Sequence, residues 1–409
     1  MSATKQNKRH PEFDVAIVGG GMVGLTAALA LAQLDFRVAV LEGREPQLAP
    51  WADAFDIRVS AINRASQSVF QNLQAWSAMR ELGVFPYQRM HVWEAAGSAA
   101  IHFEGADVGR LNLGHIVENR VMLQALWQQV QSNSNISLMV PAQAEYIDVY
   151  HDHVRIALAN RSLSALVVIG ADGGNSWVRQ QMGVHSHDGD YQQSALVATV
   201  KLEKPHQECA WQVFRHLGPL ALLPMRDNHC SIVWSSTSQE AQGLLHLPEA
   251  DFNYALMQAV DEKFGAMNLN GERALFALCH RHSDRYVKPR IALIGDAAHT
   301  IHPLAGQGVN LGILDAACLV QVLASARRAT RDVGLHSVLR QYERWRRGNN
   351  AIMLNSMTGI NQLYQQESDF LVQCRNTGVR FADSFQPLKQ FFVRQAMGMH
   401  ADLPKLARA

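Results

Sequence analysis

A glycine-rich segment near the N-terminus has the spacing of a phosphate-binding turn. Gly19, Gly21 and Gly24 follow an apolar run, residues 13–18, that predicts a buried strand, and a helix is expected to begin near Met22. Such glycines allow a tight turn, a close approach of the backbone to a pyrophosphate, and close packing of helix on strand. The N-terminus of the helix then faces the anion. The segment therefore predicts a dinucleotide site.

Glu42 stands where dinucleotide-binding units place an acidic residue. It ends a second apolar run, residues 37–41, and follows the glycines by about 20 positions, where a carboxylate can accept hydrogen bonds from a ribose. A glycine-rich segment alone is often only a turn. The order of strand, helix, strand and acid favours the binding site.

Two further turns carry a carboxylate beside glycine. Asp172 follows the apolar run 166–169, and Asp296 follows the run 290–294 and precedes a glycine-rich segment, residues 303–312, that is expected to open a helix. A carboxylate at a strand end can hold a sugar or ribityl hydroxyl, and the free amides of a helix N-terminus can face negative charge. The alternative is that each aspartate only caps its turn.

The strands and helices that must position these residues are expected to alternate along the first 75 residues. Regular strand and helix patterns return from residue 118. A helix is expected at 118–127, and strands are expected at 136–140, 145–150, 154–158 and 166–169. Short strand-like runs then dominate, at 195–200, 211–214, 221–223 and 231–234. After Gly312, apolar positions repeat at helical spacing. This order predicts an α/β fold with an inserted β-rich layer and helices at the end.

The composition narrows the class of protein. The 409 residues are 48% hydrophobic and carry a formal net charge of +1, so the chain can form more than one core, and no nucleic-acid partner is expected. No signal sequence is evident, and no apolar run approaches the roughly 18 residues of a membrane span. We therefore expect a cytoplasmic protein, at most peripheral to the inner membrane. The cysteines form no C-x-x-C pair, so we expect unpaired packing residues in a reducing compartment: Cys209, Cys230, Cys279, Cys318 and Cys374.

In their order, the three turns resemble those of the class A flavin monooxygenases related to para-hydroxybenzoate hydroxylase, and within them the ubiquinone-biosynthesis hydroxylases. The resemblance spans nearly the whole chain and includes the segments 58–63, 114–119, 223–225, 230–234 and 297–308. The tail, residues 394–398 and 402–404, is similar to that of the member that hydroxylates 2-polyprenylphenol.

The resemblance implies a para-hydroxybenzoate hydroxylase-like α/β fold. A Rossmann-like FAD-binding domain would be discontinuous, with residues 1–75, 105–185 and 285–335. An inserted β-sheet substrate domain would comprise residues 76–104 and 186–284, and a C-terminal helical region would comprise residues 336–409.

The same resemblance assigns cofactor-binding roles by motif. Arg58 and Arg120 would lie along the FAD, Asp296 would bind the ribityl chain, and the Asp172 turn would lie near both FAD and the reduced pyridine nucleotide. The backbone of Pro303, Gly306, Gln307 and Gly308 would lie beside the isoalloxazine, and no catalytic side chain is identified. The expected cofactor-binding residues are Gly19, Gly21, Gly24, Glu42, Arg58, Arg120, Asp172, Gly295, Asp296, Pro303, Gly306, Gly308, Val309, Asn310 and Leu311. Alternatively, the two arginines are solvated or paired at the surface.

The implied activity is ring hydroxylation. NADPH or NADH would reduce the FAD, O2 would give a flavin C4a-hydroperoxide, and one oxygen would pass to a 2-polyprenylphenol ortho to its hydroxyl. The protein would exclude water and stabilise the flavin anion with backbone amides. Candidate substrate-pocket residues in the β-rich layer are Trp211, Phe214, Leu223 and Trp234, each of which could equally be an ordinary core residue.

Two other functions stay open. One is a sibling hydroxylase that acts at another ring position or on another phenol. The other is a non-catalytic FAD-binding scaffold of the ubiquinone-synthesis complex. The resemblance also implies that complex as a partner, and a polyprenylated substrate requires either a tunnel for its tail or contact of the C-terminal helices with a membrane or lipid carrier. The oligomeric state is left open.

Residues 276–282 depart from the family, because family members often carry an aromatic-Pro-Leu segment before the last strand and this proline is missing here. Its loss is expected to loosen a wall of the substrate pocket. His280 and His282 would share a strand face, but no metal is expected because no Cys, Asp or Glu nearby completes a ligand set. His299 and His302 are expected to be local hydrogen-bonding residues rather than acid–base catalysts.

Overall fold

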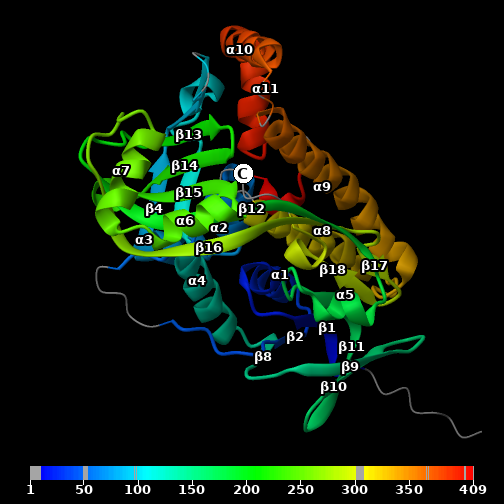
Figure 1. The fold of residues 1–409 in the computed structure, drawn as a ribbon. Coiled ribbons are helices and arrows are strands. Elements are labelled where there is room, and N and C mark those ends of the chain that lie inside the picture. Colours follow the sequence, from blue (N-terminus) through cyan, green and yellow to red (C-terminus); the bar gives the residue numbers. More distant parts are fainter. Residues whose placement is uncertain are drawn as a thin grey trace, which may run out of the picture.

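The computed structural model describes residues 11–48, 54–95, 97, 99–300, 308–364, 366, 368–399 and 402–408. These residues form two large sheets and a small one, with helices around and between them (Figure 1). The first sheet carries the glycine-rich turn, and the second sheet faces this turn.

The first sheet has a parallel centre in the order β18-β11-β1-β2-β8. Strand β17 extends one edge, β10 adds antiparallel to β11, and β9 adds antiparallel to β10. The strands are β1 (Phe13–Val18), β2 (Val38–Leu41), β8 (Ile136–Met139), β9 (Ala144–Val149), β10 (Val154–Leu158), β11 (Arg161–Gly170), β17 (Val287–Lys288) and β18 (Ile291–Leu293). Their parallel order brings the three turns to one edge of the sheet, because each turn follows the carboxyl end of a central strand.

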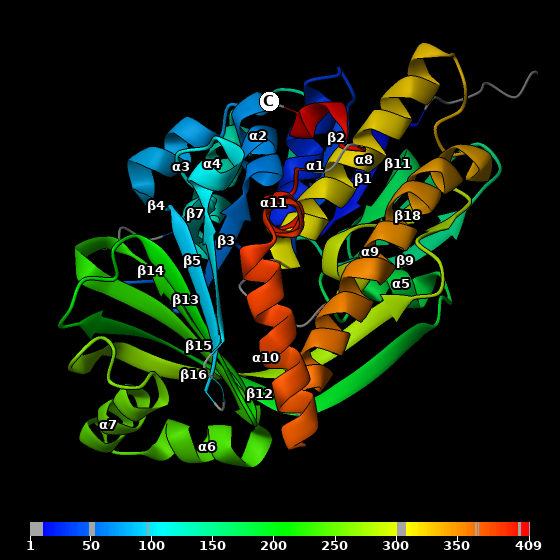
Figure 2. The same cartoon turned by 90° about the horizontal axis from the view of Figure 1, so that it is seen from above.

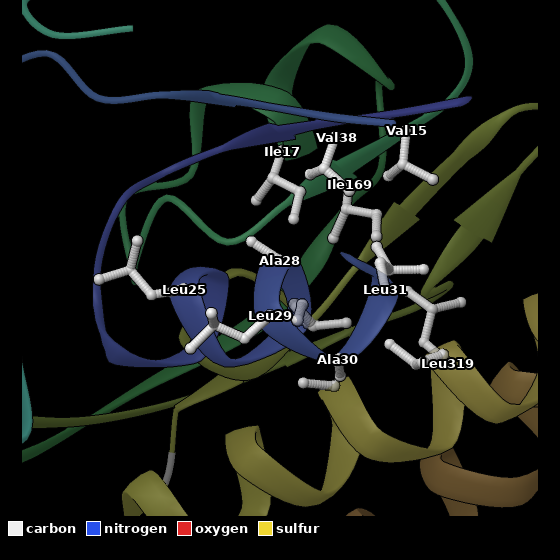
Figure 3. Packing of buried hydrophobic residues seen from close by; sticks show 14 of the residues in the cluster. Val15, Ile17, Leu25, Ala28, Leu29, Ala30, Leu31, Val38, Ile169 and Leu319 are labelled. Atoms are coloured by element: carbon white, nitrogen blue, oxygen red, sulfur yellow. The ribbon is translucent and has the colours of Figure 1, made fainter. Parts of the chain in front are cut away.

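Helix α1 (Met22–Ala32) is buried on all sides, because it lies between this sheet and α8 (Gly308–Arg328). Figure 3 shows Val15 and Ile17 of β1 facing Ala28 and Leu31 of α1, with Leu319 of α8 on the other side. A helix that is apolar all round is found buried in a protein core or in a membrane. This packing fixes the glycine-rich turn against the core.

The second sheet runs in the order β19-β16-β12-β15-β14-β13-β5-β6. Its long antiparallel strands alternate, so that Leu196, Ile232 and Trp234 face α6 and α7, whereas Ser231 and Val233 face the opposite way. Figure 2 shows α6 and α7 under the sheet, away from α11 (Gln386–Ala396). The elements are β5 (Arg89–Glu94), β6 (Ala100–Glu104), β12 (Ser186–Leu202), β13 (Cys209–Arg215), β14 (Gly218–Pro224), β15 (His229–Thr237), β16 (Met267–Ser283), β19 (His299–Thr300), α6 (Ser238–His246) and α7 (Glu249–Ala259).

A small sheet, β3-β7-β4, joins the two large ones. Its strands are β3 (Val59–Asn63), β4 (Val84–Tyr87) and β7 (Gly114–Glu118), and the helices around it are α2 (Arg64–Asn72), α3 (Trp76–Gly83), α4 (Asn119–Gln131) and the short η1 (Gly105–Val108). Short helices elsewhere are α5 (Trp177–Gln181), η2 (Arg226–Asn228), η3 (Gly295–Ala297) and η5 (Lys405–Ala407).

The C-terminal helices are α9 (His336–Tyr364), α10 (Asp369–Ser384) and α11 (Gln386–Ala396). In Figure 2 they leave the first layer along α8 and then pass the edge of the second sheet. Helix α8 alone among the described helices is long and apolar enough to cross a membrane, and 78% of that apolar stretch is buried inside the protein.

The α/β architecture with an inserted β-rich layer and C-terminal helices is confirmed. Trp76 and Met79 of α3 pack in the core of the first layer rather than in the second, so the segment that enters the second sheet begins at β5. All five cysteines are free, but Cys279 and Cys374 are exposed, so the expectation that every cysteine packs in a core is wrong for these two.

Candidate functional site

The glycine-rich turn has the backbone geometry that a bound phosphate requires. Gly19 has a φ of +109°, and a Cβ there would lie 2.4 Å from the carbonyl oxygen of Ala171. A Cβ on Gly24 would lie 2.1 Å from the carbonyl oxygen of Gly19. Helix α1 can therefore approach β1 only because these residues lack side chains. Gly21 is the N-cap of α1 and faces open space, so an anion can reach the free amides there.

Glu42 reaches back to this turn from the end of β2. One carboxylate oxygen accepts a hydrogen bond from the Gly20 amide (2.6 Å), and the other accepts one from the Arg44 amide (3.1 Å). Each oxygen keeps a further acceptor site, so the carboxylate can also bind ribose hydroxyls. The structure thus places Glu42 beside the phosphate turn, where the spacing predicted it.

A cleft of about 420 Å³ begins at this turn and continues between the first layer and the second sheet. Its lining includes Gly21, Arg58, Asp296, Gly308 and Val309, all of which were expected at the cofactor. Ligand pockets have volumes of roughly 300–1,000 Å³. Residues from four separate segments of the chain therefore meet in one cleft of suitable size.

Asp296 presents a carboxylate to the cleft and has no hydrogen-bond or ion-pair partner among the described residues. Water reaches the side chain from the cleft, but protein atoms surround it. These surroundings raise the pKa of the Asp296 carboxyl, and nearby His299 and Arg58 oppose the shift. An acceptor held open in this way fits a hydroxyl of a bound sugar or ribityl chain.

The turn that carries Asp296 is fixed from behind by a buried carboxylate, Asp315 of α8. Its Oδ2 accepts hydrogen bonds from the Gly295 amide (3.1 Å) and from Nε2 of His299 (2.5 Å). Its Oδ1 accepts from Nε of Arg346 (2.7 Å) and from Nδ2 of Asn350 (3.1 Å), both on α9. His299 is therefore a local hydrogen-bonding residue, as expected. The network ties the cofactor turn to two helices.

The two arginines have different surroundings. Arg58 lines the cleft, and its guanidinium lies 5.4 Å from the ring centroid of Phe276. Arg120 is not part of the cleft lining. Its Nε donates to Glu118 (2.8 Å), and its guanidinium also donates to the carbonyl oxygen of Ala54. Arg120 is therefore paired with neighbouring groups, as the alternative stated. Arg58 is the arginine that lies where it can contact a cofactor.

Asp172 caps its turn, which is the alternative that the sequence left open. Its carboxylate accepts hydrogen bonds from Oγ of Ser176 (2.5 Å) and from the Val178 amide (3.0 Å), so it caps the turn into α5. Its neighbours Ala171 and Gly173, rather than Asp172, line the cleft.

Asn310 and Leu311 support the site from outside the cleft. Asn310 is buried, donates to the Ala61 carbonyl (2.7 Å) and accepts from the Asn63 amide (3.1 Å), which ties α8 to β3. Leu311 does not line the cleft, and its carbonyl oxygen faces Arg346. Gly295 has a φ of +60° and packs against Val23. The remaining predictions, Pro303, Gly306, Gln307 and His302, lie outside the described residues.

The wall opposite the phosphate turn is the open face of the second sheet. It is formed by small or apolar side chains of β12, β15 and β16, including Ala195, Val197, Ser231, Val233 and Leu278. These residues were not predicted from the sequence, because large aromatic side chains were expected at the substrate instead. The signal was the two-residue alternation of Ser231-Ile232-Val233-Trp234, which separates a small face from a bulky one.

The four candidate substrate residues do not line this cleft. Trp234 faces α6 and α7 on the opposite side of the sheet, so the expectation that it covers a substrate ring is not supported. Phe214 stacks on Tyr364, with ring centroids 3.9 Å apart. Trp211 and Leu223 line a smaller apolar cavity beside α11.

Residues 276–278, where the family proline is missing, belong to strand β16 and pair with strand β12. Phe276, Ala277 and Leu278 pair in register with Ala195, Ser194 and Gln193 of β12. Ala277 therefore forms a regular pair, and the register of the two strands shifts just beyond Leu278, between Gln193 and Asp190. The loosening of the wall stays a prediction.

The lining fits an FAD. The turn offers amides to a pyrophosphate. Glu42 beside the turn and Asp296 in the cleft offer acceptors to hydroxyl groups. The buried hydroxyls of Ser231 and Thr300 lack partners among the described residues. Such buried polar atoms indicate a missing ligand or water. Among the described residues, no group of His, Cys, Asp or Glu is arranged to hold a metal ion.

Comparisons with known proteins agree with this geometry. A family described as FAD binding domain matches residues 12–354. The chain is 37% identical over 389 residues to the 3-demethoxyubiquinol 3-hydroxylase of Escherichia coli, which covers 94% of this chain and 98% of that protein. It is 34% identical over 399 residues to the ubiquinone hydroxylase UbiL of Rhodospirillum rubrum, covering 97% and 92%.

The fold is also found among solved structures. PqsL, a probable FAD-dependent monooxygenase from Pseudomonas aeruginosa, matches with a TM-score of 0.76 at 21% identity and covers 90% of this chain and 99% of that chain. At this identity the similarity supports the fold alone.

Proposed function

This chain belongs to the FAD-binding-domain family of flavin-dependent monooxygenases, and on that premise we propose that it hydroxylates the ring of a polyprenylated ubiquinone precursor. The single observation that carries the proposal is the shared cleft. One end has a phosphate turn and the open carboxylate of Asp296, and the other has a face of small, mostly apolar side chains.

The proposed reaction inserts one oxygen atom of O2 into a ring C–H bond. The second oxygen atom leaves as water, and NAD(P)H supplies the two electrons. When bound, FAD accepts those electrons and activates the oxygen. The chain's own task is to bind both partners and keep bulk water from the reacting atoms.

Several residues of the cleft suit these tasks. The N-terminus of α8 at Gly308 and Val309 lines the cleft, where its amides and dipole favour negative charge on the reduced cofactor. Arg58 adds a positive charge to the lining of the cleft. Val197 and Val233 exclude water from the opposite wall. No side-chain nucleophile is needed for this chemistry.

Two ring positions compete. The tail segments 394–398 and 402–404 favour 2-polyprenylphenol, hydroxylated ortho to its hydroxyl. The relative that is 37% identical is named for 3-demethoxyubiquinol, which favours the sibling position. We give the second position more weight, because that similarity extends over 94% of this chain and the tail covers only a few residues.

We further propose a peripheral contact with a membrane and membership of a ubiquinone-synthesis complex, in the cytoplasm or at the inner membrane. Support for the contact comes from exposed phenylalanines on α10, on α11 and between the two helices: Phe370, Phe381, Phe385, Phe391 and Phe392. Aromatic side chains on an exposed helix face suit the interface of a bilayer. Sedimentation of the protein with lipid vesicles would support this contact, and its loss in a Phe391→Ser/Phe392→Ser variant would locate it.

The function is tested by turnover. The FAD-loaded protein is incubated with O2, NADPH or NADH, and short-tailed forms of 2-polyprenylphenol and 3-demethoxyubiquinol, and the products are identified by mass spectrometry and NMR. We expect one added ring oxygen on one substrate, which fixes the position. Oxidation of NAD(P)H that yields only H2O2 with both substrates would contradict the proposal.

A further inference from the structure

Basic side chains from four segments of the chain gather around the start of α2. We call them the basic cluster: Arg64, Arg80, Arg110 and His115. In that order they belong to α2, to α3, to the segment after η1 and to β7. Asn63 of β3 pairs with Gly114 of β7, so Arg64 and His115 each follow one member of a strand pair. The cluster is separate from the cofactor cleft, because none of its members is part of the cleft lining.

The guanidinium of Arg64 is fixed by neutral acceptors. It donates to Oε1 of Gln67 (2.9 Å) and to the carbonyl oxygen of Asn112 (3.3 Å). Its Nε is buried and has no partner in the part of the chain that the structure describes. Buried polar atoms without a partner indicate a missing water or ion. Arg64 therefore keeps one unused donor in a fixed position.

His115 presents a second unused polar atom. Its side chain is 9% exposed and packs edge-on against Trp76, with ring centroids 5.0 Å apart. Its Nδ1 is buried and has no partner among the described residues. Burial, Arg64 and Arg80 lower the pKa of His115 to about 4, so the ring is neutral at pH 7 and can donate one N–H. Both arginines are thus close enough for their charge to act on this ring.

The positive charge of the cluster is not balanced by a carboxylate. Arg64, Arg80 and Arg110 form no ion pair with any described residue. Burial and Arg110 lower the pKa of the Arg64 guanidinium, and Tyr87 opposes the shift. Asp107 is the acidic residue closest to Arg110 in the sequence, but it lies 3.8 Å from the Lys389 ammonium and accepts from an amide. Arginines without a counter-charge attract an anion, and their several donors suit the oxygens of a phosphate.

The cluster opens to the surface beside α11. Arg80 and Arg110 are exposed, and Leu111, next to Arg110, is 91% exposed. The backbone amide of Arg64 donates to the carbonyl oxygen of Met397 (3.1 Å), directly after α11. Cationic side chains next to exposed apolar ones suit the surface of an anionic bilayer.

We propose that Arg64, Arg110 and His115 bind a phosphate group, to which Arg80 adds positive charge from α3. Two sources carry this chemistry, the headgroup of an anionic lipid and the free phosphate ion, and the exposed Leu111 favours the lipid. The lipid source rests on the membrane contact proposed above. The phosphate site depends neither on that contact nor on the proposed reaction.

The first measurement uses the free ion. Thermal unfolding of the FAD-loaded protein, whose glycine turn is then occupied, is compared in phosphate and in chloride of equal ionic strength. We expect phosphate to raise the unfolding temperature of the wild type by about 2 °C more than that of Arg110→Gln, because a bound ion stabilises the folded state. Arg64→Lys keeps the charge but loses the Nε donor, and it should show the same loss. Arg344→Gln removes an exposed arginine of α9 and should behave as the wild type.

The second measurement uses sedimentation with phosphatidylcholine vesicles that contain phosphatidylglycerol. We expect Arg110→Gln to bind them about 5-fold more weakly than the wild type and Arg344→Gln to bind them equally well. Arg110 is exposed and its side chain has no partner among the described residues, so its loss should leave the fold intact.

The two measurements together identify the source of the phosphate. A difference with vesicles assigns the site to a lipid headgroup, and a difference with the free ion alone assigns it to soluble phosphate. The proposal is overturned if Arg110→Gln and Arg344→Gln behave alike in both measurements. Neither measurement involves turnover, so failure of the proposed hydroxylation would leave this result unchanged.

Discussion

The two ends of the cleft are built by different means. At the cofactor end, Gly19 and Gly24 have no room for a Cβ, and a buried ion network holds the turn that carries Asp296. At the substrate end, the wall is a sheet face of small side chains such as Ser231 and Val233. The difference indicates that changes at the first end should abolish cofactor binding, whereas changes at the second should alter only which ring is accepted.

The largest effect is expected for Gly24→Val. The new Cβ would lie 2.1 Å from the carbonyl oxygen of Gly19, so α1 must move away from the turn. We expect the affinity for FAD to fall by at least about 100-fold, together with lower stability. Fluorescence titration of the apoprotein with FAD measures the loss. Gly43→Ala is the matched control, because no atom lies within 4 Å of a Cβ there, and it should bind FAD normally.

Asp315→Asn tests the buried network. It leaves Arg346 and His299 without a charged partner inside the protein, and the free energy of unfolding should fall by about 3–5 kcal/mol. Denaturant unfolding of the apoprotein measures this. The exposed pair of Asp148 and Arg155 is the control, since Asp148→Asn should have little effect. Equal stability of the two variants would show that the network does not hold the turn.

The same variant has a defined pH dependence. Burial alone would raise the pKa of the Asp315 carboxyl, but His299 and Arg346 outweigh it and lower the pKa to about 2. A lowered folded-state pKa means that the ionised carboxylate stabilises the fold above about pH 4 and that this contribution is lost as the pH falls toward 2. The stability difference between wild type and Asp315→Asn should therefore be constant near neutrality and shrink below about pH 4.

Asp296→Asn separates binding from folding at the same turn. Asp296 has no partner among the described residues, so the midpoint of thermal unfolding of the apoprotein should hardly change. The affinity for FAD should fall by about 10-fold, because an amide is a weaker acceptor than a carboxylate. A fall in stability as large as that of Asp315→Asn would show that Asp296 is structural.

The smallest effects are expected on the second sheet. Val233→Phe narrows the substrate wall and should raise the KM for the ring by about 10-fold, with FAD affinity unchanged. Trp234→Phe, its neighbour on the other face, should lower stability by about 1 kcal/mol and leave KM unchanged. Steady-state kinetics compare the two. A change of KM in the Trp234→Phe variant would show instead that Trp234 contributes to the substrate site.

The sequence predicted the cofactor end well, because its requirements are local. Gly19, Gly24 and Glu42 are fixed by a short strand–helix–strand unit, so their spacing alone reports their geometry. Asp172 was harder to judge. A carboxylate beside a glycine turn can bind a ligand or cap a helix, and only the structure shows that Asp172 caps the turn through Ser176 and Val178.

The substrate end was predicted less well, because its residues come together only through long-range pairing. Strand β15 has a bulky and a small face, and which face meets the cleft depends on where α6 and α7 pack. The role of Asp315 was also missed. Its partners Arg346 and Asn350 lie more than 30 positions along the chain, as the separations of 31 and 35 residues show.

The most direct test of this account is the electron density of crystals of the FAD-loaded protein. We expect the pyrophosphate against the amides at Gly21, the ribityl chain within hydrogen-bonding distance of Asp296, and the flavin ring facing Ser231 and Val233. A flavin bound elsewhere, or with its ring turned away from the open face of β12, β15 and β16, would contradict the account.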